Sequence, residues 1–201
     1  WFNKEINSLG DLKGLKMRIP GFAGEVLAKL GAKPTNIPPA ELYTALERNT
    51  IDALEWVGPS LDLRMGFHKI APYYYTGWHE PATELQFMIN EKAYNSLPED
   101  LQKILVAAMK LASYDMYTQS THESGKNLAT IQKDFPHVEI LSFPKPVMAA
   151  IKKANDDLLL EFAAKDPKTK EILDSITNYQ KEVRAWTNFA DRAYLNNSDS
   201  K

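Results

Sequence analysis

The chain has 201 residues, 44% of them hydrophobic, which is enough to bury a sizeable core in one or two domains. Lysine and arginine total 24 against 26 acidic residues, for a formal net charge of -2, so nucleic acid is not an expected partner. The absence of cysteine excludes disulfides, thiol nucleophiles and cysteine zinc sites, and the longest apolar runs fall far short of the roughly 20 residues of a membrane helix.

The first third of the chain alternates β-like and helical segments. Strands are expected at Leu15–Ile19, Lys33–Ile37 and Ile51–Val57, and helices at Gly24–Leu30 and Ala40–Arg48. Pro20-Gly21 ends the first strand, Gly31 suits a helix C-terminus, and Pro38-Pro39 precedes the second helix. This alternation predicts an α/β fold with parallel strands.

The rest of the chain is expected to be mainly helical. A short helical segment after Ser60 leads into an aromatic tract, Tyr73 to Trp78, that marks a crossing between substructures. Strands are expected at Glu84–Asn90 and Val138–Phe143, and helices at 96–134, Pro146–Ala164 and Pro167–Asn196. Ser96 and Glu99 form a capping-box pattern at the start of the longest helix.

Catalytic signatures are missing from the sequence. Neither GxGxxG, GxxxxGK[ST] nor GxSxG occurs, and the four histidines have no zinc-ligand spacing. We therefore predict no catalytic residue, although the sequence does not exclude an enzyme.

Arg18 lies at the C-terminal end of an expected strand, where open α/β sheets collect ligands. A guanidinium there can hold a carboxylate through two parallel hydrogen bonds. The alternative is that Arg18 ends a strand in solvent.

Glu55 and Trp56 interrupt an otherwise apolar strand. A buried acid is costly unless it is paired or bound to a metal, so Glu55 is a candidate ligand for a hard cation and Trp56 a candidate pocket wall. A half-exposed glutamate on an edge strand is the alternative. Gln86 shares one strand face with Glu84 and Met88, and its oxygen is a further candidate ligand.

The aromatic residues Tyr74, Tyr75, Trp78 and His79 also allow two interpretations. They can line a pocket, or they can pack a core or an interface, and we favour packing because that is the commoner role of such clusters.

Several segments together resemble the TRAP family of extracytoplasmic solute receptors. They are 9–18 (LGDLKGLKMR), 31–34 (GAKP), 41–47 (ELYTALE), 50–56 (TIDALEW) and 97–102 (LPEDLQ), in the order that the family uses. The Glu-Trp-Val-Gly-Pro sequence at 55–59, with three tyrosines downstream, is similar to the branch that binds 2-oxo acids with a cation.

The resemblance assigns roles residue by residue. It implies that Arg18 clamps the ligand carboxylate and that Glu55 and Gln86 bind a sodium or calcium ion. It makes Trp56 both a carbonyl ligand of that ion and part of the pocket wall, with Phe22 a weaker candidate for the wall.

The resemblance also implies a periplasmic-binding-protein-like (type II) fold of two lobes. Residues 10–57 would form the core of the ligand-gripping lobe, 78–95 part of a depleted lobe, and 96–134 a lobe-spanning helix. Residues 165–196 would form a C-terminal helix and a possible homodimer contact. A further N-terminal portion found in family members is missing here.

The function implied is that of a periplasmic receptor. It would bind a small carboxylate, either a 2-oxo acid such as pyruvate or a monocarboxylate such as lactate, and deliver it to the TRAP membrane permease. The alternatives are a metal-dependent enzyme acting on a carboxylate, or a fragment that has lost binding.

Overall fold

A computed structural model of the chain describes residues 1–78 and 85–198. It divides into two compact units, Trp1–Ala150 and Ile151–Lys201. The strands identified in the described residues all belong to the first unit, and the second is built from the end of α6 (Lys145–Lys165), α7 (Pro167–Phe189) and α8 (Asp191–Ser198). None of the helices in the described ranges is both long and apolar enough to cross a membrane.

Two parallel sheets form the centre of the first unit. In one, β1 (Lys16–Arg18) lies between β2 (Lys33–Thr35) and β3 (Ala53–Leu54), with Arg18 opposite Leu54. In the other, β4 (Tyr73–Tyr75) pairs with β5 (Glu139–Leu141). The helical crossovers α1 (Gly21–Lys29) and α2 (Leu42–Glu47), with the 3-10 turn η2 (Pro39–Glu41), connect the strands of the first sheet. The predicted α/β class with parallel strands is confirmed.

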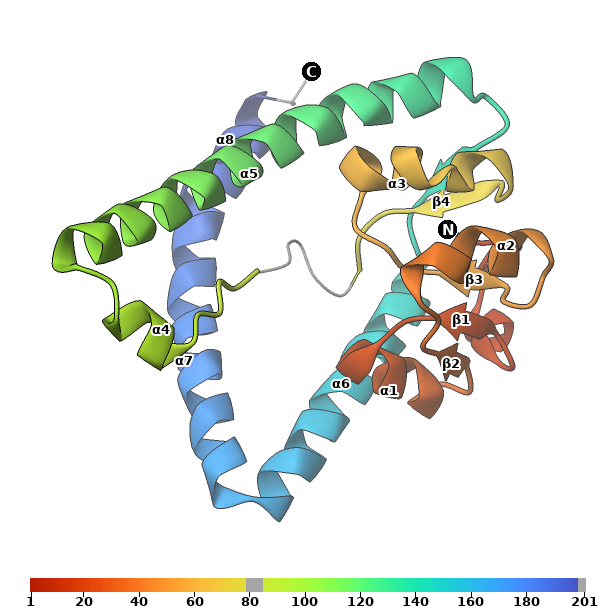
Figure 1. The fold of residues 1–201 in the computed structure, drawn as a ribbon. Coiled ribbons are helices and arrows are strands. Elements are labelled where there is room, and N and C mark those ends of the chain that lie inside the picture. The colour runs from red at the N-terminus through yellow and green to blue at the C-terminus, as the bar shows by residue number, and fades with distance from the viewer. Residues whose placement is uncertain (79–84, 199–201) are drawn as a thin grey trace. The chain divides into compact units, whose positions relative to one another are not determined.

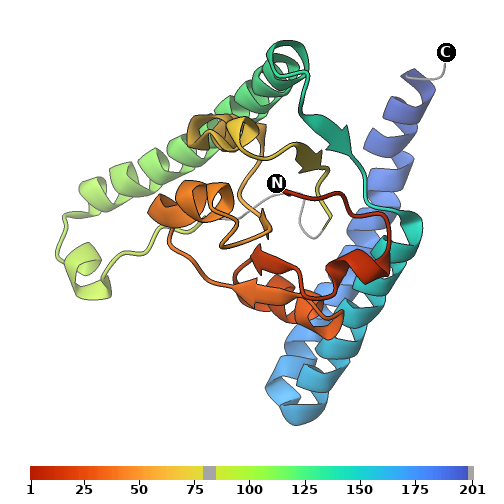
Figure 2. The same cartoon turned by 90° about the vertical axis from the view of Figure 1, so that its right-hand side faces the viewer.

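The N-terminal segment joins these two sheets. Phe2 forms antiparallel bridges with both Ala53 and Tyr73, and Figure 2 shows this segment, in red, between them. The Phe2 amide donates to the Tyr73 carbonyl at 2.9 Å, and the Leu54 amide donates to the Trp1 carbonyl at 2.9 Å. Because Phe2 runs antiparallel to both neighbours, β3 and β4 point the same way. The carboxyl ends of β1, β3, β4 and β5 therefore face one edge.

Helices cover this framework. The short α3 (Pro59–Met65) lies against the C-terminal half of α5 (Glu99–Asp134), as Figure 1 shows. The Asn127 side chain of α5 donates to the Pro59 carbonyl at 2.9 Å, fixing the start of α3. The remaining short helices are η1 (Leu9–Leu12), η3 (Phe67–Lys69) and α4 (Glu91–Asn95). The core beneath them is built from Trp1, Leu42, Leu46, Ile51, Leu54, Phe67, Ala71, Ile131 and Val138.

Three predicted elements need correction, and one strand, in the aromatic tract, was not predicted. The strand predicted at Glu84–Asn90 is wrong over residues 85–90, which are irregular and exposed and have no strand partner in the described ranges; Glu84 lies outside those ranges. The aromatic tract contains a strand, β4. The strand predicted at 51–57 is limited to β3, because the backbone turns after Glu55 into α3. The single helix predicted at Pro167–Asn196 is two helices, since Ala190 leaves helical geometry (φ -97°, ψ -94°).

Gly24 of α1 permits close packing of this helix on β1 and β2. A Cβ added there would lie 2.7 Å from the Ile19 carbonyl oxygen and 3.2 Å from the Pro34 Cβ. We expect Gly24→Ala to lower the free energy of unfolding by about 1–3 kcal/mol through overpacking. The measurement is urea unfolding followed by circular dichroism.

Gly125→Ala is the matched control, because a Cβ at this exposed position of α5 meets no atom within 4 Å. Helix propensity alone predicts that it raises stability by about 0.5–1 kcal/mol. Equal effects of the two substitutions would contradict the packing role of Gly24.

Candidate functional site

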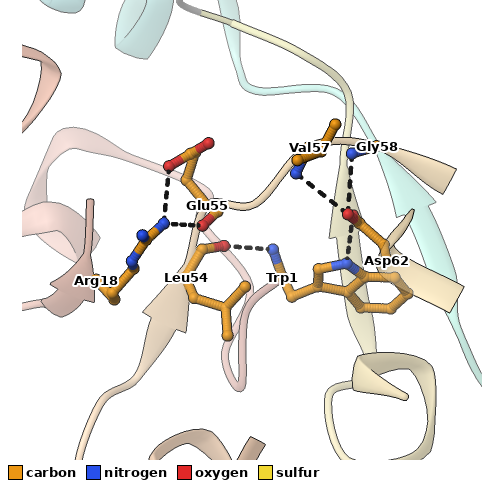
Figure 3. Close-up of polar contacts among 7 residues, drawn as sticks. All are labelled: Trp1, Arg18, Leu54, Glu55, Val57, Gly58 and Asp62. Carbon is orange, nitrogen blue, oxygen red and sulfur yellow. Dashed lines mark hydrogen bonds and ion pairs between the residues drawn. The ribbon is translucent and has the colours of Figure 1, made fainter. Parts of the chain in front are cut away.

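Arg18 and Glu55 meet at the carboxyl edge of the sheet, because the β1–β3 register places Leu54 beside Arg18. The Arg18 Nη1 donates to the Glu55 carbonyl at 2.9 Å and approaches the Glu55 carboxylate at 3.3 Å, as Figure 3 shows. The side chains are only 10% and 16% exposed. The structure therefore excludes both solvent-exposed alternatives for these residues, and it holds a compensated pair of charges at the strand ends.

Trp56 also contacts Arg18. The Arg18 Cζ lies 5.4 Å from the centroid of the Trp56 ring, within cation–π range. Two buried donors, the Arg18 Nε and the Trp56 Nε1, have no hydrogen-bond partner among the described residues. Unmatched buried donors cost free energy, so an acceptor such as a ligand carboxylate has a favourable place here.

A cavity of about 400 Å³ lies beside Glu55 and Trp56; Arg18 contacts both of these residues but is not itself among the described residues that line the cavity. The described residues that line it are Trp1, Phe2, Met17, Leu54, Glu55, Trp56, Val57, Gly58, Pro59, Asp62, Tyr74, Tyr75, Thr76, Gly77, Trp78, Leu128 and Ile140. Its wall is mostly apolar and includes six aromatic residues, with the Glu55 and Asp62 carboxylates as its acidic groups. Such a cavity suits a small organic ligand held by few polar contacts.

The aromatic tract serves both roles considered for it. Tyr75 packs against Phe143, with ring centroids 4.3 Å apart, and its hydroxyl accepts the Ile6 amide at 2.8 Å. Tyr74, Tyr75 and Trp78 also line the cavity. His79 falls outside the described residues.

Asp62 is the site residue that sequence reasoning missed. It is 2% exposed, and its carboxylate accepts four hydrogen bonds. They come from the Trp1 indole at 2.8 Å, the Tyr74 hydroxyl at 3.0 Å, and the backbone amides of Val57 at 3.2 Å and Gly58 at 2.9 Å. The available signal was an acid in the first turn of a helix opened by Gly58-Pro59, a position from which a carboxylate can reach back to free amides.

The other predicted site residues lie apart from this group. Phe22 is half-buried in the first turn of α1, outside the set of described residues that line the cavity. Gln86 is exposed in the irregular stretch 85–90. The structure thus brings together Arg18, Glu55 and Trp56, but neither Phe22 nor Gln86 is placed at the cavity.

The donor set beside the cavity suits a hard cation. The Glu55 carboxylate and the Trp56 carbonyl provide oxygens, which sodium and calcium prefer. No group of three or more histidine and acidic side chains is gathered for a metal within the described ranges. Because calcium takes six to eight oxygens, carbonyls, water and the ligand itself must supply much of the shell.

The two parallel sheets, with the Arg18–Glu55 pair at their carboxyl edge, form the framework of the candidate site. The family model for bacterial extracellular solute-binding protein, family 7, also called DctP, matches residues 2–166. The chain belongs to this family, which confirms the predicted TRAP receptor class, its fold and its extracytoplasmic placement.

Relatives with known ligands are similar over nearly the whole chain. A monocarboxylate 2-oxoacid-binding periplasmic protein of Nostoc is 37% identical over 201 residues, covering 100% of this chain and 55% of the relative. A TRAP periplasmic solute-binding protein from Colwellia psychrerythraea, with bound calcium and pyruvate, is 78% identical with a TM-score of 0.95. One from Pseudoalteromonas atlantica, with bound sodium and pyruvate, is 76% identical with a TM-score of 0.93.

Each of these two structures covers 98% of this chain, whereas this chain covers 60% of each of them. A third relative, from Bordetella bronchiseptica, is 39% identical with a TM-score of 0.91 over 98% of this chain and 59% of its own. It is described as a mixed-occupancy dimer with calcium and picolinate. The expectation of a calcium or sodium ion beside a carboxylate is thus met in relatives of this chain.

The hydrogen bond between Tyr74 and Asp62 has a consequence at high pH. Burial, then the charge of Asp62, raises the pKa of Tyr74 above its ordinary value of 10.0. The native state therefore keeps this proton when the unfolded chain loses it, and the associated stability is present below pH 10 and lost as the pH rises beyond it. We expect Tyr74→Phe to reduce the decline in unfolding free energy above pH 10 by up to about 1.4 kcal/mol per pH unit.

Urea unfolding at pH 9, 10 and 11 measures this slope. Tyr114→Phe is the control, since this tyrosine is 66% exposed on α5. A slope unchanged by Tyr74→Phe, or changed equally by both substitutions, would contradict the assignment.

Proposed function

We propose that this chain contributes the ligand-gripping lobe of a TRAP solute receptor that binds a 2-oxo acid such as pyruvate together with calcium or sodium. The observation that carries the proposal is the buried Arg18–Glu55 pair beside Trp56 at the carboxyl edge of the sheet. Support comes from the two relatives more than 75% identical to this chain that hold pyruvate with calcium or sodium.

The chemistry follows from the exchange of partners within this pair. A ligand carboxylate can accept from the unmatched Arg18 Nε, and a cation can take the Glu55 carboxylate and the Trp56 carbonyl. A carboxylate alone adds negative charge beside Glu55, and a cation alone adds positive charge beside Arg18. Bound together they keep the site neutral, so each should strengthen binding of the other.

Gln86 and Phe22 enter the proposal as outer members of the site. Gln86 has an amide oxygen suited to a hard cation and lies exposed in an irregular stretch, from which it can complete the cation shell. Phe22 lies at the start of the helix that follows Arg18, and its part in the proposal is to extend the ligand wall.

The proposed role is to bind and deliver a ligand, without catalysing a reaction. The receptor would work in the periplasm, close on its ligand and be recognised by the TRAP membrane permease. No Ser, Cys or His arrangement for nucleophilic chemistry was found in the sequence, and the family is one of solute-binding proteins. We expect no turnover of pyruvate by the full-length protein in the presence of calcium.

Titration calorimetry of the full-length protein with pyruvate, with and without calcium, tests this function. We expect tight binding with calcium and much weaker binding without added cation. Arg18→Ala should weaken pyruvate binding by about 2–5 kcal/mol, or at least about thirtyfold, because the carboxylate loses a buried charged partner.

Arg48→Ala, which removes an exposed arginine at the end of α2, serves as the control and should bind like the parent. Arg18→Lys separates charge from geometry, since lysine keeps the charge but lacks the planar fork. A parent protein without affinity for pyruvate in either sodium or calcium, or an unimpaired Arg18→Ala, would refute the proposal.

The homodimer belongs to this proposal too. The exposed apolar residues of α7 recur at the average spacing of 3.5 that a coiled-coil seam requires. They are Ile172, Ile176, Tyr179, Val183 and Trp186, each at least 39% exposed. We propose that a second copy of the receptor packs along this stripe.

We expect Val183→Glu to convert a dimer of the full-length protein into monomers in sedimentation velocity runs, because it places a charge on the stripe. Lys181→Glu, on the opposite side of the same helix, should leave the dimer intact. A monomeric parent protein at all concentrations would rule out the interface.

A further inference from the structure

We propose that Asp62 is the positioning residue of the ligand site: its buried carboxylate fixes the direction of the Trp56 carbonyl and the path of the loop that carries Glu55. This inference rests on the proposed function, because it assigns the support for the cation ligands of that same site. The carboxylate itself does not contact the ligand in this assignment.

The setting of Asp62 differs from that of an ordinary buried acid. Within the described part of the chain no lysine or arginine side chain pairs with it, and its four partners are neutral N–H and O–H donors. At 2% exposure Asp62 is shielded from solvent, and a positive charge that acts on it is the Trp1 ammonium, whose pKa burial lowers and the charge of Asp62 raises. Burying a carboxylate is costly, and charge-assisted hydrogen bonds are the stronger kind, so these four donors are held firmly.

The link from Asp62 to the ligand site runs through one peptide unit. The Trp56 carbonyl and the Val57 amide belong to the same planar, trans peptide, so they point in opposite directions. The Val57 N–H donates to the Asp62 Oδ1 at 3.2 Å, as Figure 3 shows. The carbonyl of Trp56 is thereby turned away from Asp62 and cannot rotate without breaking this bond.

Gly58 allows a second amide to reach the same oxygen. Its φ of +150° is a backbone conformation that residues with a side chain rarely adopt, and its N–H donates to the Asp62 Oδ1 at 2.9 Å. Two consecutive amides thus converge on one oxygen, which fixes the turn immediately after Glu55 and Trp56.

The other oxygen anchors Asp62 to the central sheet. Its donors are the Trp1 indole, from the segment that joins the two sheets, and the hydroxyl of Tyr74 in β4. The rings of Trp1 and Tyr74 stack with centroids 4.1 Å apart, and Trp1 is 4% exposed. Asp62 therefore transfers the rigidity of this packed pair to the loop that carries the cation ligands.

An isosteric change tests this role, because only a carboxylate matches the four donors. In Asp62→Asn, the amide NH₂ must face either the two backbone amides or the indole of Trp1, all of which are donors only. Tyr74 alone can reverse its hydroxyl. The substitution keeps the size of the side chain and breaks at least one contact.

The experiment uses the full-length protein and titrates calcium at saturating pyruvate and pyruvate at saturating calcium, well below the unfolding temperature. We expect Asp62→Asn to weaken both affinities by about tenfold, through the displaced Trp56 carbonyl. Asp52→Asn is the matched control, since Asp52 also accepts a backbone amide, that of Lys16 at 2.8 Å, but lies outside the cavity lining.

Terbium in place of calcium provides a readout that a general loss of stability does not move. Luminescence decay rates in H₂O and D₂O count the water molecules on the bound ion. We expect Asp62→Asn to add about one water, because a lost carbonyl ligand is replaced by solvent. The Asp52→Asn protein should keep the hydration number of the parent.

The outcomes separate the two proposals. If the parent binds pyruvate with calcium but Asp62→Asn stays within about twofold of it and terbium hydration is unchanged, the positioning role is wrong while the proposed function stands. If the parent binds neither, both fall. Should Asp62→Asn not fold, Tyr74→Phe takes its place, with an expected loss of about threefold, and unchanged affinity then overturns the inference.

Discussion

The parallel pairing of β1 with β3 is the constraint on which the candidate site depends. Two residue pairs, Met17 with Ala53 and Arg18 with Leu54, are enough to place a guanidinium and a carboxylate side by side at the sheet edge. The register also explains why the pair is buried, since the residues beneath it are core positions of both strands. Glu55 directly follows the last residue of β3, where both its carbonyl and its carboxylate lie within reach of the Arg18 Nη1.

The N-terminal segment extends this constraint to the rest of the edge. By pairing antiparallel with β3 and β4 at once, Phe2 aligns two sheets that are otherwise separate. That alignment brings the residues following β4 to the same edge as Glu55, so one cavity is lined from both sheets. Of the aromatic residues that pack around Phe2, Tyr75 also lines the cavity, whereas Phe143 packs outside the lining.

Features that depend on neighbouring residues in the sequence were largely predicted, whereas features that depend on contacts between distant residues were not. Pro20-Gly21 and Gly31 bound α1 to within a few residues. The capping box predicted from Ser96 and Glu99 is wrong, because α5 begins after Pro98 without a side-chain cap and Ser96 ends α4, although the predicted start of α5 lies within a few residues of the observed one. Arg18 could be singled out because ligands collect at the carboxyl ends of parallel strands, and Glu55 because it interrupts an apolar strand, where an acid is costly unless it is paired. By contrast, the strand expected at Glu84–Asn90 depended on alternation alone, which predicts a strand only if a neighbouring strand and a core face exist. Asp62 was missed because its donors lie as far as 61 residues away.

The two carboxylates at the site, those of Glu55 and Asp62, differ in the kind of partner that they bind. Glu55 is matched by the charged side chain of Arg18, which in the proposed function also pairs with the ligand carboxylate while Glu55 binds the cation. The Asp62 carboxylate instead accepts from two backbone amides and from the indole of the packed Trp1, which are held in place by the fold. In the proposed function, the Arg18–Glu55 pair contacts ligand and ion, while Asp62 keeps the geometry of the loop that carries Glu55. The segment from Glu55 to Asp62 therefore carries both kinds of acid: Glu55, which is paired with a side chain, and Asp62, which holds the backbone between them.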